Sequence, residues 1–120
     1  MDNNVENLVE LMDCFIQRIQ QGVSLSGILK SCGYTRVGIY GMGRLGRRLY
    51  DELKELVVYT IDRNNEMIYG DVPLKGPDEE LTPVDLIIIT PICDIDAIYR
   101  LLRKKSACEI ITFRELMNMN

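Results

Sequence analysis

Apolar residues recur along this chain with two different spacings, and the first of them is helical. Near the N-terminus an apolar stripe predicts an amphipathic helix over residues 4–21, and a shorter helix follows, capped by Ser24 or Ser26 and ended by Gly33. The long stripe consists of Val5, Leu8, Val9, Met12, Phe15, Ile16 and Ile19. Such a stripe covers either this chain's own sheet or a second copy of the chain. The sequence leaves both open, so a homodimer formed through the N-terminal helix is one expectation.

Beyond residue 33 short apolar runs alternate with helical patterns. The runs predict strands at 37–40, 57–61, about 72–74, 84–90 and 109–113, with helices at about 44–55, 94–105 and 114–119 between and after them. Alternating strands and helices build parallel sheets through right-handed crossovers. We therefore expect an α/β domain at 34–120, with a doubly wound five-stranded parallel sheet of order 3-2-1-4-5, preceded by a helical extension at 1–33.

A glycine motif lies at the first strand-to-helix junction. Gly41, Gly43 and Gly46 form a G-x-G-x-x-G, and Asp62 follows Gly41 by 21 residues, at the end of the second strand. In this layout the first glycine allows the turn, the second admits a diphosphate close to the backbone, and the third lets helix and strand pack closely. Unpaired helix amides favour the diphosphate, and the acid binds a ribose. The alternative is a glycine-rich turn that packs well and binds nothing.

The predicted strand order places a ligand crevice between the first and fourth strands, outside their carboxyl ends. The loops on either side of it supply the candidate binding residues, which are Gly41, Met42, Gly43, Arg44, Leu45, Gly46, Asp62, Arg63, Thr90, Pro91 and Ile92. Asp62 favours the free ribose of NAD, whereas Arg63 is suited to the 2′-phosphate of NADP. We expect NAD as the cofactor, with NADP as an alternative.

Composition narrows the function further. The chain has 120 residues, of which 47% are hydrophobic, and a net charge of −4, which supports one domain with a real core and argues against a nucleic-acid partner. Its apolar runs are too short to span a membrane, and the polar N-terminus does not resemble a signal peptide, so a cytoplasmic protein is expected. It has no histidine and four cysteines without a C-x-x-C pair, so we expect no metal site and no Ser-His-Asp triad.

Four segments carry a family resemblance, and it covers roughly residues 36–113. They are residues 38–49, 61–63, 70–74 and 84–91. The chain is similar to the small Rossmann domains that precede the catalytic region of nucleotide-sugar dehydratases and epimerases, and to CoA-binding Rossmann domains, including NADH-sensing repressors. The resemblance implies that the three glycines cradle a diphosphate and Asp62 holds a ribose. It also implies that Thr90 and Pro91 line the pocket near the second half of the nucleotide.

These observations favour a dinucleotide-binding Rossmann domain that is a module or subunit of an oxidoreductase or a nucleotide-sugar system. The alternative is a non-catalytic module that senses CoA or another nucleotide, or that serves assembly. No constellation of proton-transferring side chains stands out in the sequence, so catalysis is left open and no catalytic residue is named.

Overall fold

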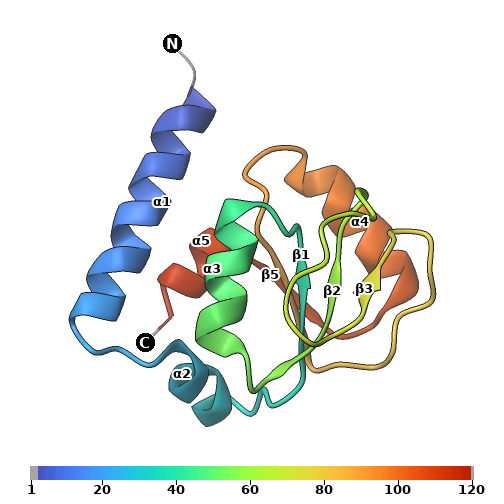
Figure 1. Ribbon diagram of the computed structural model, residues 1–120, viewed down its shortest axis with the longest axis horizontal. Helices are drawn as coiled ribbons and strands as arrows, with labels where there is room; N and C mark the ends of the chain where they lie inside the picture. The colour runs from blue at the N-terminus through green and yellow to red at the C-terminus, as the bar shows by residue number, and fades with distance from the viewer. Residues whose placement is uncertain (1–2, 120) are drawn as a thin grey trace.

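The computed structural model describes residues 3–119, and the side chains of residues 7–119 (Figure 1). Its strands are β1 (Val37–Tyr40), β2 (Val57–Ile61), β3 (Leu74–Lys75), β4 (Leu86–Ile89) and β5 (Glu109–Thr112), and its helices are α1 (Asn3–Gln20), α2 (Leu25–Ser31), α3 (Arg44–Leu53), α4 (Ile95–Lys105) and α5 (Phe113–Met117). All neighbouring strands pair in parallel, in the order β3-β2-β1-β4-β5. The predicted α/β fold and its strand order are confirmed, and the topology is Rossmann-like.

Helices cover the two faces of the sheet unequally. Figure 1 shows α3 and α5, with α1 and α2 outside them, on one side of the strands and α4 on the other. The first side buries the apolar stripe of α3, formed by Leu45, Leu49 and Leu53, against β1 and β4. The second buries Ile98 and Leu102 of α4 against the opposite side chains of the same strands. Strands covered on both faces explain why β4 is an unbroken apolar run.

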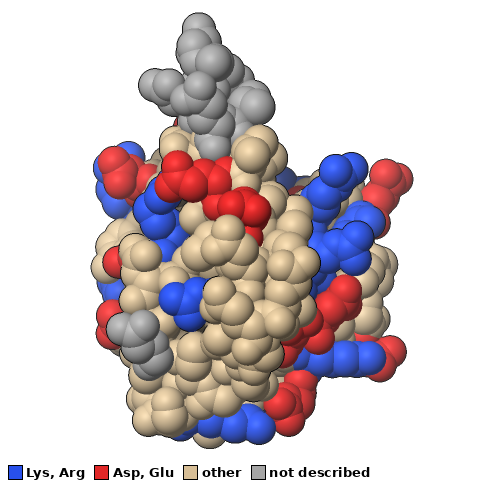
Figure 2. All heavy atoms as spheres, turned by 90° about the vertical axis from the view of Figure 1, so that its left-hand side faces the viewer, with Lys and Arg blue, Asp and Glu red and all other residues tan. Residues whose placement is uncertain are grey.

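Helix α1 divides its apolar stripe between the core and the surface. Leu11 and Phe15 are buried, and the ring centroid of Phe15 lies 5.6 Å from that of Phe113 at the start of α5. The other side of the helix exposes Leu8, Val9, Ile16 and Ile19, which are 39% to 63% accessible, and the side chain of Val5 lies outside the described residues. Figure 2, which faces this side of the molecule, shows a broad area with few charged groups. A homodimer through this surface stays a prediction.

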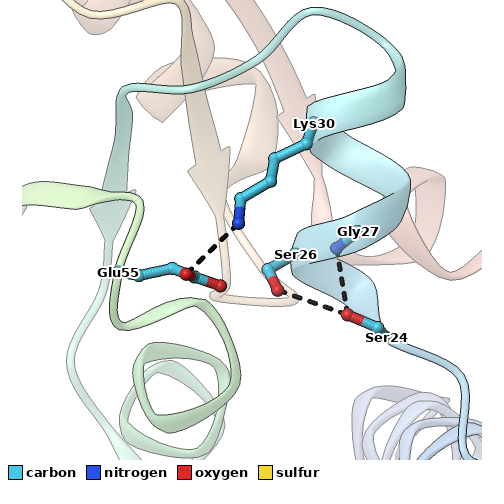
Figure 3. A network of polar contacts seen from close by, with 5 residues as sticks. All are labelled: Ser24, Ser26, Gly27, Lys30 and Glu55. Atoms are coloured by element: carbon cyan, nitrogen blue, oxygen red, sulfur yellow. Dashed lines mark hydrogen bonds and ion pairs between the residues drawn. The ribbon is translucent and has the colours of Figure 1, made fainter.

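Helix α2 follows α1 in the chain and packs against α3. The Ser24 hydroxyl caps α2 by accepting the Gly27 N–H at 3.0 Å, as expected of a serine at that position (Figure 3). Lys30 near the end of α2 pairs with Glu55, just beyond α3, at 3.2 Å. The pair lies at the surface and contributes little, so the buried Leu25 and Leu29 hold α2 in place. In residues 3–119 no helix combines the length and the apolar character needed to cross a membrane.

Two strands begin later than predicted. β3 is shorter and begins at Leu74, because Pro73 has no N–H to donate to a neighbouring strand. β4 begins at Leu86, and the carboxylate of Asp85 before it accepts N–H groups of the loop that precedes β1. Asp94 occupies the cap of α4 in a left-handed conformation, at φ 58°, and its side chain makes no capping hydrogen bond.

Asp85 provides a prediction about acid stability. Its Oδ2 accepts the backbone N–H groups of Thr35 and Arg36 at 2.9 and 3.0 Å, and these bonds lower the pKa of the Asp85 carboxyl. A depressed pKa stabilises the fold above the pKa of an unfolded aspartate, about 3.9, and this contribution is lost as the pH falls through the folded value. We therefore expect Asp85→Asn to lose less stability than wild type between pH 7 and pH 3 in urea unfolding. Asp78→Asn, which removes an exposed acid, should keep the wild-type loss, and equal pH dependence in all three proteins would contradict the assignment.

Candidate functional site

The loops that follow β1 and β4 meet at the carboxyl ends of these neighbouring strands and form a groove of about 340 Å³. Its walls come from both loops, from the start of α3 and from the end of β2, and they are Leu8, Gly41, Gly43, Arg44, Leu45, Gly46, Asp62, Met67, Thr90, Pro91 and Ile92. Most of the residues proposed from the sequence therefore share one groove. The two exceptions are Met42, whose side chain is fully buried in the core, and Arg63, which lines an adjoining hollow with Asp62 and Cys93.

Two of the three motif glycines are required by the fold itself. Gly41 has φ +93°, and a Cβ there would lie 2.6 Å from Pro91 Cδ and 2.7 Å from Thr90 Oγ1. A Cβ on Gly46 would overlap the carbonyl oxygen of Gly41. These glycines let the turn form and let α3 pack against the end of β1, so both would be needed even in a protein that binds nothing.

Gly43 differs from the other two. Its φ is −72°, which any residue adopts, and a Cβ built on it has no neighbour within 4 Å. It occupies the cap position of α3 without a side chain to accept a helix N–H, and the first turn of α3 contains no acidic residue. The positive end of the helix therefore opens toward the groove, which is the arrangement that binds an anion.

Asp62 turns its carboxylate toward the glycine loop. Its Oδ2 accepts the Met42 N–H at 2.8 Å, and its Oδ1 accepts the Asn64 N–H at 2.9 Å. A carboxylate offers about four acceptor positions, so two protein bonds leave room for hydroxyl donors from a ligand. Asp62 is partly exposed and lines the groove, so it both holds the loop and faces the open space.

Thr90 holds the end of β1 and the start of the loop after it through hydrogen bonds of its side chain. Its side chain is almost fully buried, and Oγ1 lies 3.0 Å from the Tyr40 carbonyl oxygen and 2.7 Å from that of Gly41. The hydroxyl proton is donated to these carbonyls, so the Thr90 side chain holds the loop instead of offering a donor to the groove. Pro91 and Ile92 are partly exposed and give that side of the groove an apolar wall.

Sequence reasoning missed two residues of the groove. Leu8 comes from α1, and no local signal in the sequence indicates that the helical extension reaches the carboxyl ends of the strands. Met67 comes from the loop after β2, which carries no strand or helix that would fix its position. Arg44 and Asp62 are the ionisable side chains of the groove, one suited to an anion and the other to hydroxyl groups.

Comparisons with known proteins do not place the chain in a family. No protein-family model matches it, and neither curated proteins nor solved structures give a significant match. The resemblance to nucleotide-sugar dehydratases and epimerases therefore rests on the motifs alone. The sheet order and the flanking helices establish a Rossmann-like topology, which is compatible with nucleotide binding.

Proposed function

We propose that this protein binds a dinucleotide of the NAD or NADP type in the groove between the loops after β1 and β4. The diphosphate lies against the start of α3, and the adenosine ribose lies at Asp62. In this role the chain is a module or subunit of an oxidoreductase or of a nucleotide-sugar system.

Gly43 provides the observation that supports this proposal most directly. Local geometry explains Gly41 and Gly46, but no contact in the described residues requires position 43 to lack a side chain. A glycine at a helix cap is also less favourable than Ser, Asp or Asn by a few tenths of a kcal/mol. An anion that approaches the backbone at this position would explain why the residue is glycine, because any side chain there would block the approach.

The groove supports this placement on both sides. At the start of α3 the first-turn amides and the helix dipole attract negative charge, and the Arg44 side chain adds a full positive charge. Across the groove Asp62 keeps acceptor capacity for ribose hydroxyls. Coenzyme A has the same diphosphate, but the 3′-oxygen of its ribose is phosphorylated, so it offers Asp62 one ribose hydroxyl where NAD offers two. Dependence of binding on Asp62 therefore separates NAD from CoA experimentally.

The test is calorimetric titration of NAD, NADH, NADP and CoA into wild type, Asp62→Asn and Glu66→Gln. We expect dissociation constants on the order of micromolar for the favoured dinucleotide, weakened about tenfold by Asp62→Asn. Glu66→Gln removes the same charge from an exposed residue of the neighbouring loop and should leave binding unchanged.

Asparagine is preferred to alanine at position 62 because the loss of the whole carboxylate would free the Met42 amide and disturb the glycine loop. Its single side-chain oxygen keeps one of the two protein bonds, so we expect a stability loss of about 1 kcal/mol, measured by thermal unfolding of the same samples. Absence of heat and of thermal stabilisation with every dinucleotide would contradict the proposal, and binding of CoA alone, insensitive to Asp62→Asn, would favour the CoA module.

A further inference from the structure

A second hollow, of about 440 Å³, adjoins the groove on the side of α3 that faces the loop after β2. It is lined by Gly43, Arg44, Arg47, Arg48, Met67 and Tyr69. Gly43, Arg44 and Met67 also line the groove, so the two spaces are continuous. The second hollow concentrates three guanidinium groups at the end of a helix that already carries partial positive charge.

The three arginines come from the first two turns of α3. Arg44, Arg47 and Arg48 stand at positions i, i+3 and i+4, which bring side chains to one side of a helix. Arg47 is held in place: its Nε donates to the Met42 carbonyl at 3.2 Å, and its guanidinium carbon lies 5.6 Å from the ring centroid of Tyr69. Its terminal nitrogens keep donors for another partner.

Ion pairs within the described part of the chain do not neutralise this cluster. Among the side chains of residues 7–119, none of the three arginines forms an ion pair within 4.0 Å. Asp51, one turn after Arg47 and Arg48 on the same helix, instead accepts the Tyr69 hydroxyl at 3.0 and 3.1 Å. Positive charges that line one hollow repel one another, and a dianion in the hollow would reduce this repulsion and receive several charge-assisted hydrogen bonds.

We propose that the arginine hollow binds a phosphate monoester carried by the same nucleotide whose diphosphate lies at the start of α3. The inference rests on the proposed function and narrows it, because it selects nucleotides with an additional phosphate over those without one. NADP carries such a group on the 2′-oxygen of its adenosine ribose and CoA on the 3′-oxygen, and each keeps one free ribose hydroxyl for Asp62. A monoester is a compact dianion with three acceptor oxygens, which suits a cluster of planar guanidinium donors.

Two ligand pairs that differ only in the monoester test this proposal, namely NADP against NAD and CoA against 3′-dephospho-CoA. Titrations use wild type, Arg48→Gln and Arg100→Gln. Arg48 lies one turn beyond the diphosphate position, and Arg100 is an exposed arginine on α4 that serves as the charge-matched control. We expect wild type to bind the phosphorylated member of at least one pair more tightly than the other member, by about tenfold or more. Arg48→Gln should reduce this ratio of affinities to about threefold or less. Arg100→Gln should keep the wild-type ratio. Thermal unfolding verifies that both variants are folded.

Equal affinity for both members of each pair in wild type would overturn the arginine hollow as a monoester site. A preference for the phosphorylated member that survives in both Arg48→Gln and the double variant Arg44→Gln/Arg48→Gln would also overturn it. If NAD or dephospho-CoA still binds in those cases, the diphosphate site stands and only this inference fails. If no nucleotide and no inorganic pyrophosphate binds to wild type, the proposed function fails together with it. A steeper loss of affinity between about 50 and about 200 mM salt for the phosphorylated members than for the unphosphorylated ones would support the assignment.

Discussion

Replacement of Gly43 by Asp is expected to abolish dinucleotide binding while leaving the protein at least as stable as wild type. The backbone at position 43 has φ −72° and open space around it, so an aspartate fits without a clash. Its carboxylate can accept a first-turn N–H of α3 and complement the helix dipole, which is worth a few tenths to about 1 kcal/mol. The same carboxylate occupies the place proposed for the diphosphate and repels it, so we expect a loss of affinity of at least about 100-fold.

Gly43→Asn is the matched control for this experiment. Asparagine has nearly the same shape and caps helices as well as aspartate does, but it carries no charge. We expect it to weaken binding less than aspartate, and the difference between the two variants should shrink as salt is added. Titration calorimetry measures the affinities and urea unfolding the stabilities. Dinucleotide affinity close to wild type in Gly43→Asp would remove the observation on which the proposed function depends.

The sheet and its order could be predicted because they follow from local patterns. The apolar run of β4, the buried leucine stripe of α3 and the glycine motif each indicate one element, and right-handed crossovers leave few arrangements of these elements. The position of Asp62 beside the loop follows in the same way, since a residue at the end of β2 must lie next to the end of β1.

The different reasons for the three glycines could not be predicted, because they depend on atoms far away in the sequence. Thr90 and Pro91 approach Gly41 across the switch point, and only coordinates show that nothing in the described residues approaches Gly43. The same holds for Leu8, which reaches the groove from the helical extension, and for Arg48. Arg48 shares the arginine hollow with Met67 and Tyr69, which come from a loop that has no regular structure of its own.

The exposed half of the α1 stripe shows a further limit. Periodicity identified the helix, but a stripe wider than its contact with the core looks the same in sequence as one that is fully buried. The structure separates Leu11 and Phe15, which pack inward, from Ile16 and Ile19, which do not. Pairing of two copies through this surface therefore depends on a partner that the pattern alone cannot name.

Replacement of Gly46 by Ala is expected to unfold the protein or nearly so, with a loss of at least about 3 kcal/mol of the free energy of unfolding. Gly46 lies inside α3, where alanine is intrinsically favoured over glycine by about 1 kcal/mol, so helix propensity alone predicts the opposite sign. The added Cβ would overlap the Gly41 carbonyl oxygen, and both partners are backbone, so no side-chain rotation relieves the contact. Gly43→Ala makes the same substitution three residues earlier in open space and should change stability by about 1 kcal/mol or less. Urea unfolding followed by circular dichroism measures both variants, and equal stability of Gly46→Ala and Gly43→Ala would show that α3 does not pack on the end of β1 as closely as this geometry requires.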